Sequence, residues 1–182
     1  LVYLGTLLAL QAALATSLNL IIGVAGQVAL SHAAFYGIGA YASALLIEGT
    51  GMGFWATLPI TLAMVAAFAA AIGYPALRYT GGIHFALIPF ACGELLRLVA
   101  ANWDALTGGP QGKRLMYSPE PVFGIVFSEA RGMYLLAVAV LLVSVAAVVA
   151  IRRSRFGRAL VAIREDEILA SSLGIAVTRN KL

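Results

Sequence analysis

The sequence predicts an all-α fold, a polytopic bundle of transmembrane helices. Hydrophobic residues make up 62% of the chain and charged residues only 11%, whereas soluble domains contain about 45–50% apolar residues. The charges are also unevenly placed, because none occurs between Leu1 and Ile47 or between Gly132 and Ile151. Uncharged apolar runs of this length are typical of helices that cross a bilayer.

Five segments are long and apolar enough to cross the membrane as helices, since a crossing takes about 20 residues at 1.5 Å per residue. They are residues 1–26, 28–47, 54–77, 83–101 and 132–151. We therefore divide the chain into a transmembrane region, residues 1–151, and a following segment, residues 152–182.

The excess of positive charge lies in the last segment and predicts its side of the membrane. Residues 152–182 hold 7 basic and 3 acidic residues, while residues 1–151 hold 5 of each. The positive-inside rule explains a basic cluster directly after an apolar span, and we favour this interpretation over nucleic-acid binding. The segment is then cytoplasmic, and the N-terminus and the loop at 102–130 lie outside.

The N-terminal run has neither a preceding basic region nor a cleavage-site pattern, and Leu1 is not an initiator Met. It therefore predicts a span and not a signal peptide. We expect the chain to begin inside a longer protein.

The boundary between the first two spans is polar and rich in glycine. Its polar or glycine positions are Ser17, Asn19, Gly23, Gly26, Gln27, Ser31 and His32. Lipid cannot satisfy such groups, so we expect them to face protein or water.

Glu94 and Arg97 are charges of opposite sign inside one predicted span. Their i, i+3 spacing places them on one helix face. Such a pair could contact a substrate that bears ammonium and carboxylate groups, but intramembrane charges usually pair with each other, and we favour a structural ion pair.

Other reactive residues do not form a catalytic or metal-binding pattern. His32 and His84 have no Cys, Asp, Glu or second His at ligand spacing, and Cys92 stands alone. The run from Gly108 to Arg114 lacks the glycine spacing and the hydroxyl residue of a phosphate loop. We therefore predict neither an enzyme nor a metal site.

The cytoplasmic segment contains one expected short helix, from Asp166 to Leu173. Acidic residues favour a helix N-terminus, and Gly174 is a typical stop. Its apolar side chains, Ile168, Leu169 and Leu173, could lie on lipid headgroups or dock into a groove of a soluble partner, and the sequence leaves both open.

Three blocks of this sequence resemble the permeases of branched-chain amino acid ABC transporters, and the M-type subunit more closely than the H-type. The first block is residues 17–41, Ser-Leu-Asn-Leu-Ile-Ile-Gly-Val-Ala-Gly-Gln and onward to Tyr41. The second comprises Gly82–Leu87, Glu94–Arg97 and Leu106–Gly112, and the third comprises Gly157–Glu167 and Gly174–Leu182.

The resemblance implies a permease subunit in the bacterial inner membrane that imports branched-chain amino acids, or related small amino acids or amides. It also implies partners: a second permease subunit, two cytoplasmic ATPase subunits that bind the ATP, and a periplasmic binding protein. No cofactor of the chain itself is expected, and further spans are expected beyond Leu182. An ion-coupled secondary transporter with Glu94 as its carboxylate is the alternative.

The resemblance also assigns roles to residues. The segment 152–182 looks like the coupling loop of ABC importers, with Glu167, Ala170 and Gly174 as counterparts of its Glu-Ala-Ala and Gly pattern, although the spacing is one residue longer here. The coupling candidates are Arg158, Arg164, Glu165, Asp166, Glu167, Ala170 and Gly174. The pathway candidates, by analogy with broken helices in other transporters, are Asn19, Gln27, Ser31, His32, Glu94 and Arg97.

Overall fold

The described part of the chain is helical and divides into two compact units. The computed structural model describes residues 1–27, 31–79, 84–113, 118–121 and 126–181, and no strand occurs among them. One unit comprises Leu1–Ala29 and Pro121–Leu182, and the other comprises Leu30–Glu120. Each unit is described by itself.

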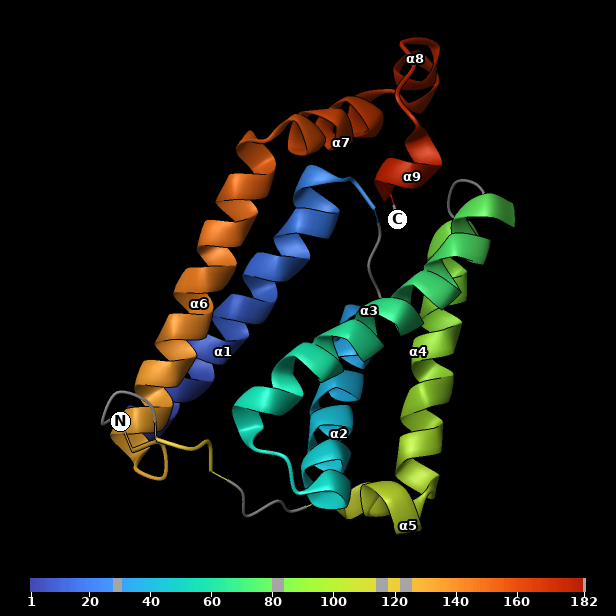
Figure 1. The fold of residues 1–182 in the computed structure, drawn as a ribbon. Coiled ribbons are helices and arrows are strands. Elements are labelled where there is room, and N and C mark those ends of the chain that lie inside the picture. Colours follow the sequence, from blue (N-terminus) through green and yellow to red (C-terminus); the bar gives the residue numbers. More distant parts are fainter. Residues whose placement is uncertain (28–30, 80–83, 114–117, 122–125, 182) are drawn as a thin grey trace. The chain divides into compact units, whose positions relative to one another are not determined.

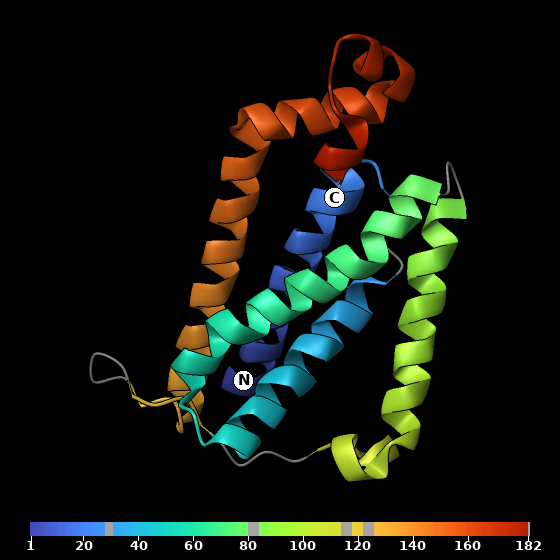
Figure 2. The ribbon, with the colours of Figure 1, turned by 45° about the vertical axis from the view of Figure 1, so that its right-hand side comes forward.

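The first unit is built on two long apolar helices, α1 (Val2–Asn19) and α6 (Ala130–Arg153). They lie side by side and run in the same direction, as both ribbon views show (Figures 1 and 2). Gly5 lets them approach closely, since a Cβ there would lie 2.9 Å from Cε2 of Tyr134. Any odd number of crossings gives its first and last spans the same direction, so this arrangement is compatible with the predicted five crossings but does not test their number.

The first predicted boundary is a break in helical geometry. After Asn19 the chain continues as one π-helical turn, η1 (Leu20–Val24), and Gly26 then takes a φ of +67°. The backbone N–H of Gln27 donates to the carbonyl of Ile21 at 3.1 Å and closes this end. Only glycine adopts such a φ without strain, so Gly26 ends the first span where the sequence predicted a break.

Three short helices follow α6: α7 (Arg155–Glu165), α8 (Glu167–Ser172) and α9 (Val177–Lys181). The change of direction between α6 and α7 occurs at Ser154, whose hydroxyl accepts a hydrogen bond from the N–H of Gly157 at 3.1 Å. α7 contacts η1, so it lies across the end of the first span (Figure 1). The sequence predicted only one helix in this segment, near α8, and α7 is an addition to that prediction.

The second unit contains three longer helices and a short helical corner. The longer ones are α2 (His32–Thr50), α3 (Phe54–Tyr79) and α4 (His84–Asn102), and the corner consists of α5 (Asp104–Thr107) and the 3₁₀ turn η2 (Gly109–Gln111). α2 and α3 form an antiparallel hairpin whose turn begins at Gly51, with a φ of +66°. α4 packs against both of them (Figure 2).

Among the described residues, three helices are long and apolar enough to cross a membrane. They are Val2–Val24, Phe54–Pro75 and Ala130–Arg153, with mean hydropathies of 1.9, 1.9 and 2.9. α2 is as long as a crossing, but His32 and Glu48 near its ends lower its hydropathy. The crossings predicted at 28–47 and 83–101 therefore stay predictions. The side chains of Arg78 and His84 are not among those that the structure describes.

Candidate functional site

A groove in the second unit lies between α2 and α4 and has a volume of about 670 Å³. Its wall on α2 consists largely of small residues, among them Ala33, Ala34 and Gly37. Gly93 brings α4 close, because a Cβ there would lie 3.2 Å from Cβ of Ala34. An apolar hollow of this size with a few polar groups is typical of sites for small organic ligands.

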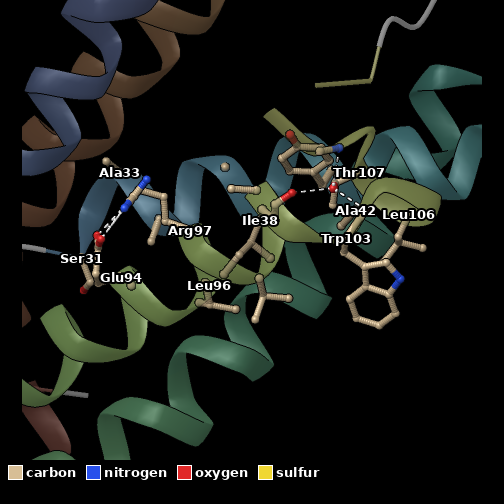
Figure 3. Close-up of a pocket in the computed structure, with 18 of the residues that line it drawn as sticks. Ser31, Ala33, Ile38, Ala42, Glu94, Leu96, Arg97, Trp103, Leu106 and Thr107 are labelled. Carbon is tan, nitrogen blue, oxygen red and sulfur yellow. Dashed lines mark hydrogen bonds and ion pairs between the residues drawn. The ribbon is translucent and has the colours of Figure 1, made fainter. Parts of the chain in front are cut away.

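The polar groups gather at the two ends of the groove (Figure 3). At one end, Glu94 and Arg97 form an ion pair, with Nη2 of Arg97 at 2.5 Å from Oε1 of Glu94 and Nε at 3.0 Å from both carboxylate oxygens. At the other end, the hydroxyl of buried Thr107 donates toward the carbonyls of Ala100 at 2.6 Å and Trp103 at 2.8 Å. The space between these ends is bounded by aliphatic side chains such as Ile38 and Leu96.

The ion pair between Glu94 and Arg97 forms as the helical spacing predicted. Their side chains are nevertheless 46% and 64% exposed in this chain. Charges at membrane depth require protein or water around them, because hydrocarbon does not solvate ions. For the crossing predicted at 83–101, the open side of the pair would therefore have to face water or another part of the assembled protein.

A short corner closes the groove beside Thr107. Gly108, Gly109 and Gly112 all have positive φ there, which is why this turn needs glycines. Lys113, just beyond it, forms an ion pair with Glu48 near the end of α2, so the corner is tied to the helix across the groove. Farther along the same loop, the indole N–H of Trp55 donates to the carbonyl of Glu120 at 3.0 Å.

The structure brings together three of the six predicted pathway residues. Ser31, Glu94 and Arg97 line the groove. His32 begins α2 and is half-buried but does not line it. Asn19 and Gln27 belong to the first unit, on either side of η1. The part of all six residues in a pathway stays a prediction.

The short helix predicted from Asp166 to Leu173 is confirmed as α8, with the expected start and stop, while its cytoplasmic side stays a prediction. The carboxylate of Asp166 accepts hydrogen bonds from the N–H groups of Ile168 and Leu169, both at 2.9 Å, and so caps the helix. Gly174 ends it with a φ of +81°.

The apolar side chains of α8 point away from the fold. Ile168, Leu169 and Leu173 are 82%, 58% and 73% exposed, whereas Ala170 is 2% exposed and packs inward. Exposed apolar side chains in so short a helix are costly in water unless another surface covers them. The face formed by Ile168, Leu169 and Leu173, here called the α8 face, is thus available for docking.

Of the remaining coupling candidates, Arg158 lies at the corner between α6 and α7, and Arg164, Glu165 and Glu167 lie at the joint between α7 and α8. Arg158 donates to the carbonyl of Arg153 at 3.0 Å, and Glu167 is the first residue of α8. Arg164 contacts Glu165 at 2.8 Å and also donates to the carbonyl of Gly23, far away in the sequence.

The helical character of α7 is what the sequence interpretation missed. The signals were present: a capping Ser154 and apolar residues at i, i+4 and i+7, namely Phe156, Leu160 and Ile163. Leu160 and Ile163 are 5% and 3% exposed. Across the parts of the chain that the structure describes, no three His, Cys, Asp or Glu residues lie close enough to share a metal ion.

Comparison with known proteins places this sequence among transport permeases. The model of the family described as branched-chain amino acid transport system permease component matches residues 1–182. The chain is similar to the high-affinity branched-chain amino acid transport system permease protein LivM of Escherichia coli K12, at 36% identity, and of Salmonella typhimurium LT2, at 35%. Both matches cover 98% of this chain and 47% of the relative, so the chain spans about half the length of these relatives. No solved structure matches it.

Proposed function

The chain belongs to the family of branched-chain amino acid transport permeases, and on this premise we propose that it is part of the membrane subunit of an ATP-driven importer. The solute is a branched-chain amino acid or a related small amino acid or amide. The protein lies in the bacterial inner membrane and crosses it several times. The observation that carries the proposal is the family match over the whole chain.

The groove between α2 and α4 is our candidate for part of the pathway. A zwitterionic amino acid has an ammonium group that suits a carboxylate and a carboxylate that suits a guanidinium, and Glu94 and Arg97 offer both. The aliphatic wall beyond them suits an apolar side chain. A structural ion pair remains the competing role for these residues, and the two roles make different predictions, given in the Discussion.

In this proposal, the conformational change driven by ATP hydrolysis is transmitted to the chain through the α8 face. The chain itself catalyses no reaction and holds no cofactor, and ATP is bound and hydrolysed by two cytoplasmic ATPase subunits. One of these covers Ile168, Leu169 and Leu173 with a groove of its own, as amphipathic helices dock in general. A second permease subunit completes the pathway, and a periplasmic binding protein delivers the solute.

The test is solute uptake by the complete system. The full-length protein is reconstituted into vesicles with its companion permease, ATPases and binding protein, and uptake of radiolabelled leucine is measured with and without ATP on the ATPase side. We expect uptake only with ATP. Uptake that is indifferent to ATP but abolished by Glu94→Gln would instead favour ion-coupled transport, which nothing in the comparisons supports. ATP-dependent uptake of a different solute would keep the mechanism and correct the substrate.

A further inference from the structure

Arg164 joins two segments of the first unit that are far apart in sequence. Its guanidinium donates from Nη1 to the carbonyl oxygen of Gly23, in the last turn of η1. The final carbonyls of a helix have no partner within the helix, and a cation near them is favoured by the helix dipole. Arg164 thus caps the end of the first span from outside that span.

The space for this arginine is created by Gly26. A Cβ on Gly26 would lie 2.2 Å from Cγ of Arg164 and 3.0 Å from its Cδ. A side chain at Gly26 is therefore excluded twice, by its φ of +67° and by the methylene groups of Arg164. The contact consists of a hydrogen bond at Gly23 and shape complementarity at Gly26.

The other side of the guanidinium is held at the joint between the two cytoplasmic helices. Nε and Nη2 of Arg164 donate to Oε1 of Glu165 at 3.2 and 2.8 Å. The next residue, Asp166, is the cap of α8. Only Glu165 and Asp166 separate Arg164 from the first residue of α8. A displacement of α8 would therefore move Arg164, and the side chain of Arg164 would transmit the movement to Gly23.

The segment that Arg164 caps is suited to a change of state. The hydrogen bonds of a π-helical turn span five residues instead of the four of an α-helix, so the turn accommodates one extra residue, and such turns are frequent at functional sites. If Leu20–Val24 returned to α-helix, the following chain would shift by one residue, which is about 1.5 Å along the axis. The carbonyl of Gly23 would move with it.

We propose that Arg164 is the positioning residue that transmits the movement of α7 and α8 to the π-helical end of the first span, through Gly23 and Gly26. This inference rests on the proposed function for its transport consequence, but the contact itself can be measured without transport. It assigns to Gly23 and Gly26 a role that the sequence patterns did not, namely the receiving site of the cytoplasmic helices.

The first test compares Arg164→Gln with Arg155→Gln, which removes an exposed charge from the other end of α7. Leucine uptake and ATP hydrolysis are measured in the same vesicles containing the full complex. For Arg164→Gln we expect leucine imported per ATP to fall about tenfold, the order expected for losing a hydrogen bond to a charged group, with hydrolysis retained. For Arg155→Gln we expect an unchanged ratio. An unchanged ratio for Arg164→Gln would overturn the proposal, because a merely structural role lowers both rates together.

The second test separates the contact from backbone strain. Gly51 has nearly the same φ as Gly26, +66°, but nothing lies within 4 Å of its Cβ position, so Gly51→Ala measures strain alone. We expect Gly26→Ala to lower the transport ratio more than Gly51→Ala. In a protein that already carries Arg164→Ala, adding Gly26→Ala should lower the transport ratio by less than it does in the unmodified protein, because the side chain that it would displace is absent. Equal effects of the two alanines would contradict a receiving site at Gly26.

A third measurement does not depend on transport. Hydrogen–deuterium exchange of peptides covering residues 20–27 is compared between Arg164→Gln and Arg155→Gln in the purified complex. We expect faster exchange in Arg164→Gln, because the helix end loses its cap. If the unmodified complex imports no solute with ATP, the proposed function fails, but the exchange measurement still tests the contact between Arg164 and Gly23. Unchanged exchange in Arg164→Gln would overturn that contact.

Discussion

Arg97 and Glu94 form an ion pair one turn apart on α4, with Nη2 of the arginine 2.5 Å from the glutamate Oε1, at one end of an otherwise apolar groove. If α4 forms the crossing predicted at 83–101, either residue alone would leave an uncompensated charge at membrane depth. The pair can therefore serve the stability of the bundle, the solute, or both, and a comparison of single and double variants distinguishes these roles.

A structural pair predicts that loss of both charges is tolerated better than loss of one. Glu94→Gln and Arg97→Gln should each lower the yield of folded complex, and the double variant should recover most of that yield. The measurement is the amount of monodisperse complex after purification. A solute contact predicts a further effect: the double variant folds, but the KM of its leucine uptake is raised. Full uptake at an unchanged KM would show that neither residue contacts the solute.

Gly157 is required by the sharp corner between α6 and α7. A Cβ there would lie 2.2 Å from the carbonyl oxygen of Ile151 and 2.7 Å from Cα of Arg152, and neither backbone atom can move away easily. Gly157→Ala should therefore destabilise the protein by about 1–3 kcal/mol, the usual cost of overpacking. Thermal unfolding of the purified complex measures this. Gly49→Ala is the control, because its Cβ position is open, and an equal loss in both variants would contradict the explanation.

Asp166 begins α8 by accepting hydrogen bonds from two backbone N–H groups. Asp166→Ala should cost about 1 kcal/mol of local helix stability, the usual cost of a lost cap. Hydrogen–deuterium exchange of residues 167–173 should become faster. Asp166→Asn keeps a capping oxygen and should leave exchange near that of the unmodified protein; if Asn behaves like Ala, capping is not the role of this residue.

Ile168 is the most exposed member of the α8 face, at 82%. A charge placed there should prevent docking of an apolar surface. It should not disturb the fold, because so exposed a side chain contributes little to the packing of this unit. We expect Ile168→Glu to reduce the ATPase subunits that co-purify with the permease, and Ile168→Leu to retain them. Normal co-purification with Ile168→Glu, together with weaker binding to anionic vesicles, would instead indicate that the α8 face lies on lipid.

The parts of the fold that could be predicted are those specified by local sequence. Gly23 and Gly26 mark the break in the first span, and Asp166 and Gly174 delimit α8, because caps and left-handed glycines act within a few residues. The amphipathic pattern of α7 is local in the same way, although the sequence prediction did not include this helix. The resemblance to branched-chain amino acid permeases was confirmed by the family match.

The parts that could not be predicted depend on packing between distant residues. Ser31 and Glu94 share a groove only because Gly93 lets α4 approach α2 at Ala34. Arg164 meets Gly23 only because α7 crosses the end of the first span. Helical periodicity indicates which residues share a face, but it does not indicate which two faces meet.

The most direct test of ATP-driven import is to measure leucine uptake and ATP hydrolysis together, in vesicles that contain the full complex with either unmodified Ile168 or Ile168→Glu. Import coupled through α8 predicts that the unmodified complex takes up leucine only while it hydrolyses ATP, and that Ile168→Glu loses uptake although the permease remains folded in the membrane. Leucine uptake that continues at the same rate in Ile168→Glu, or in the absence of ATP hydrolysis, would contradict the account.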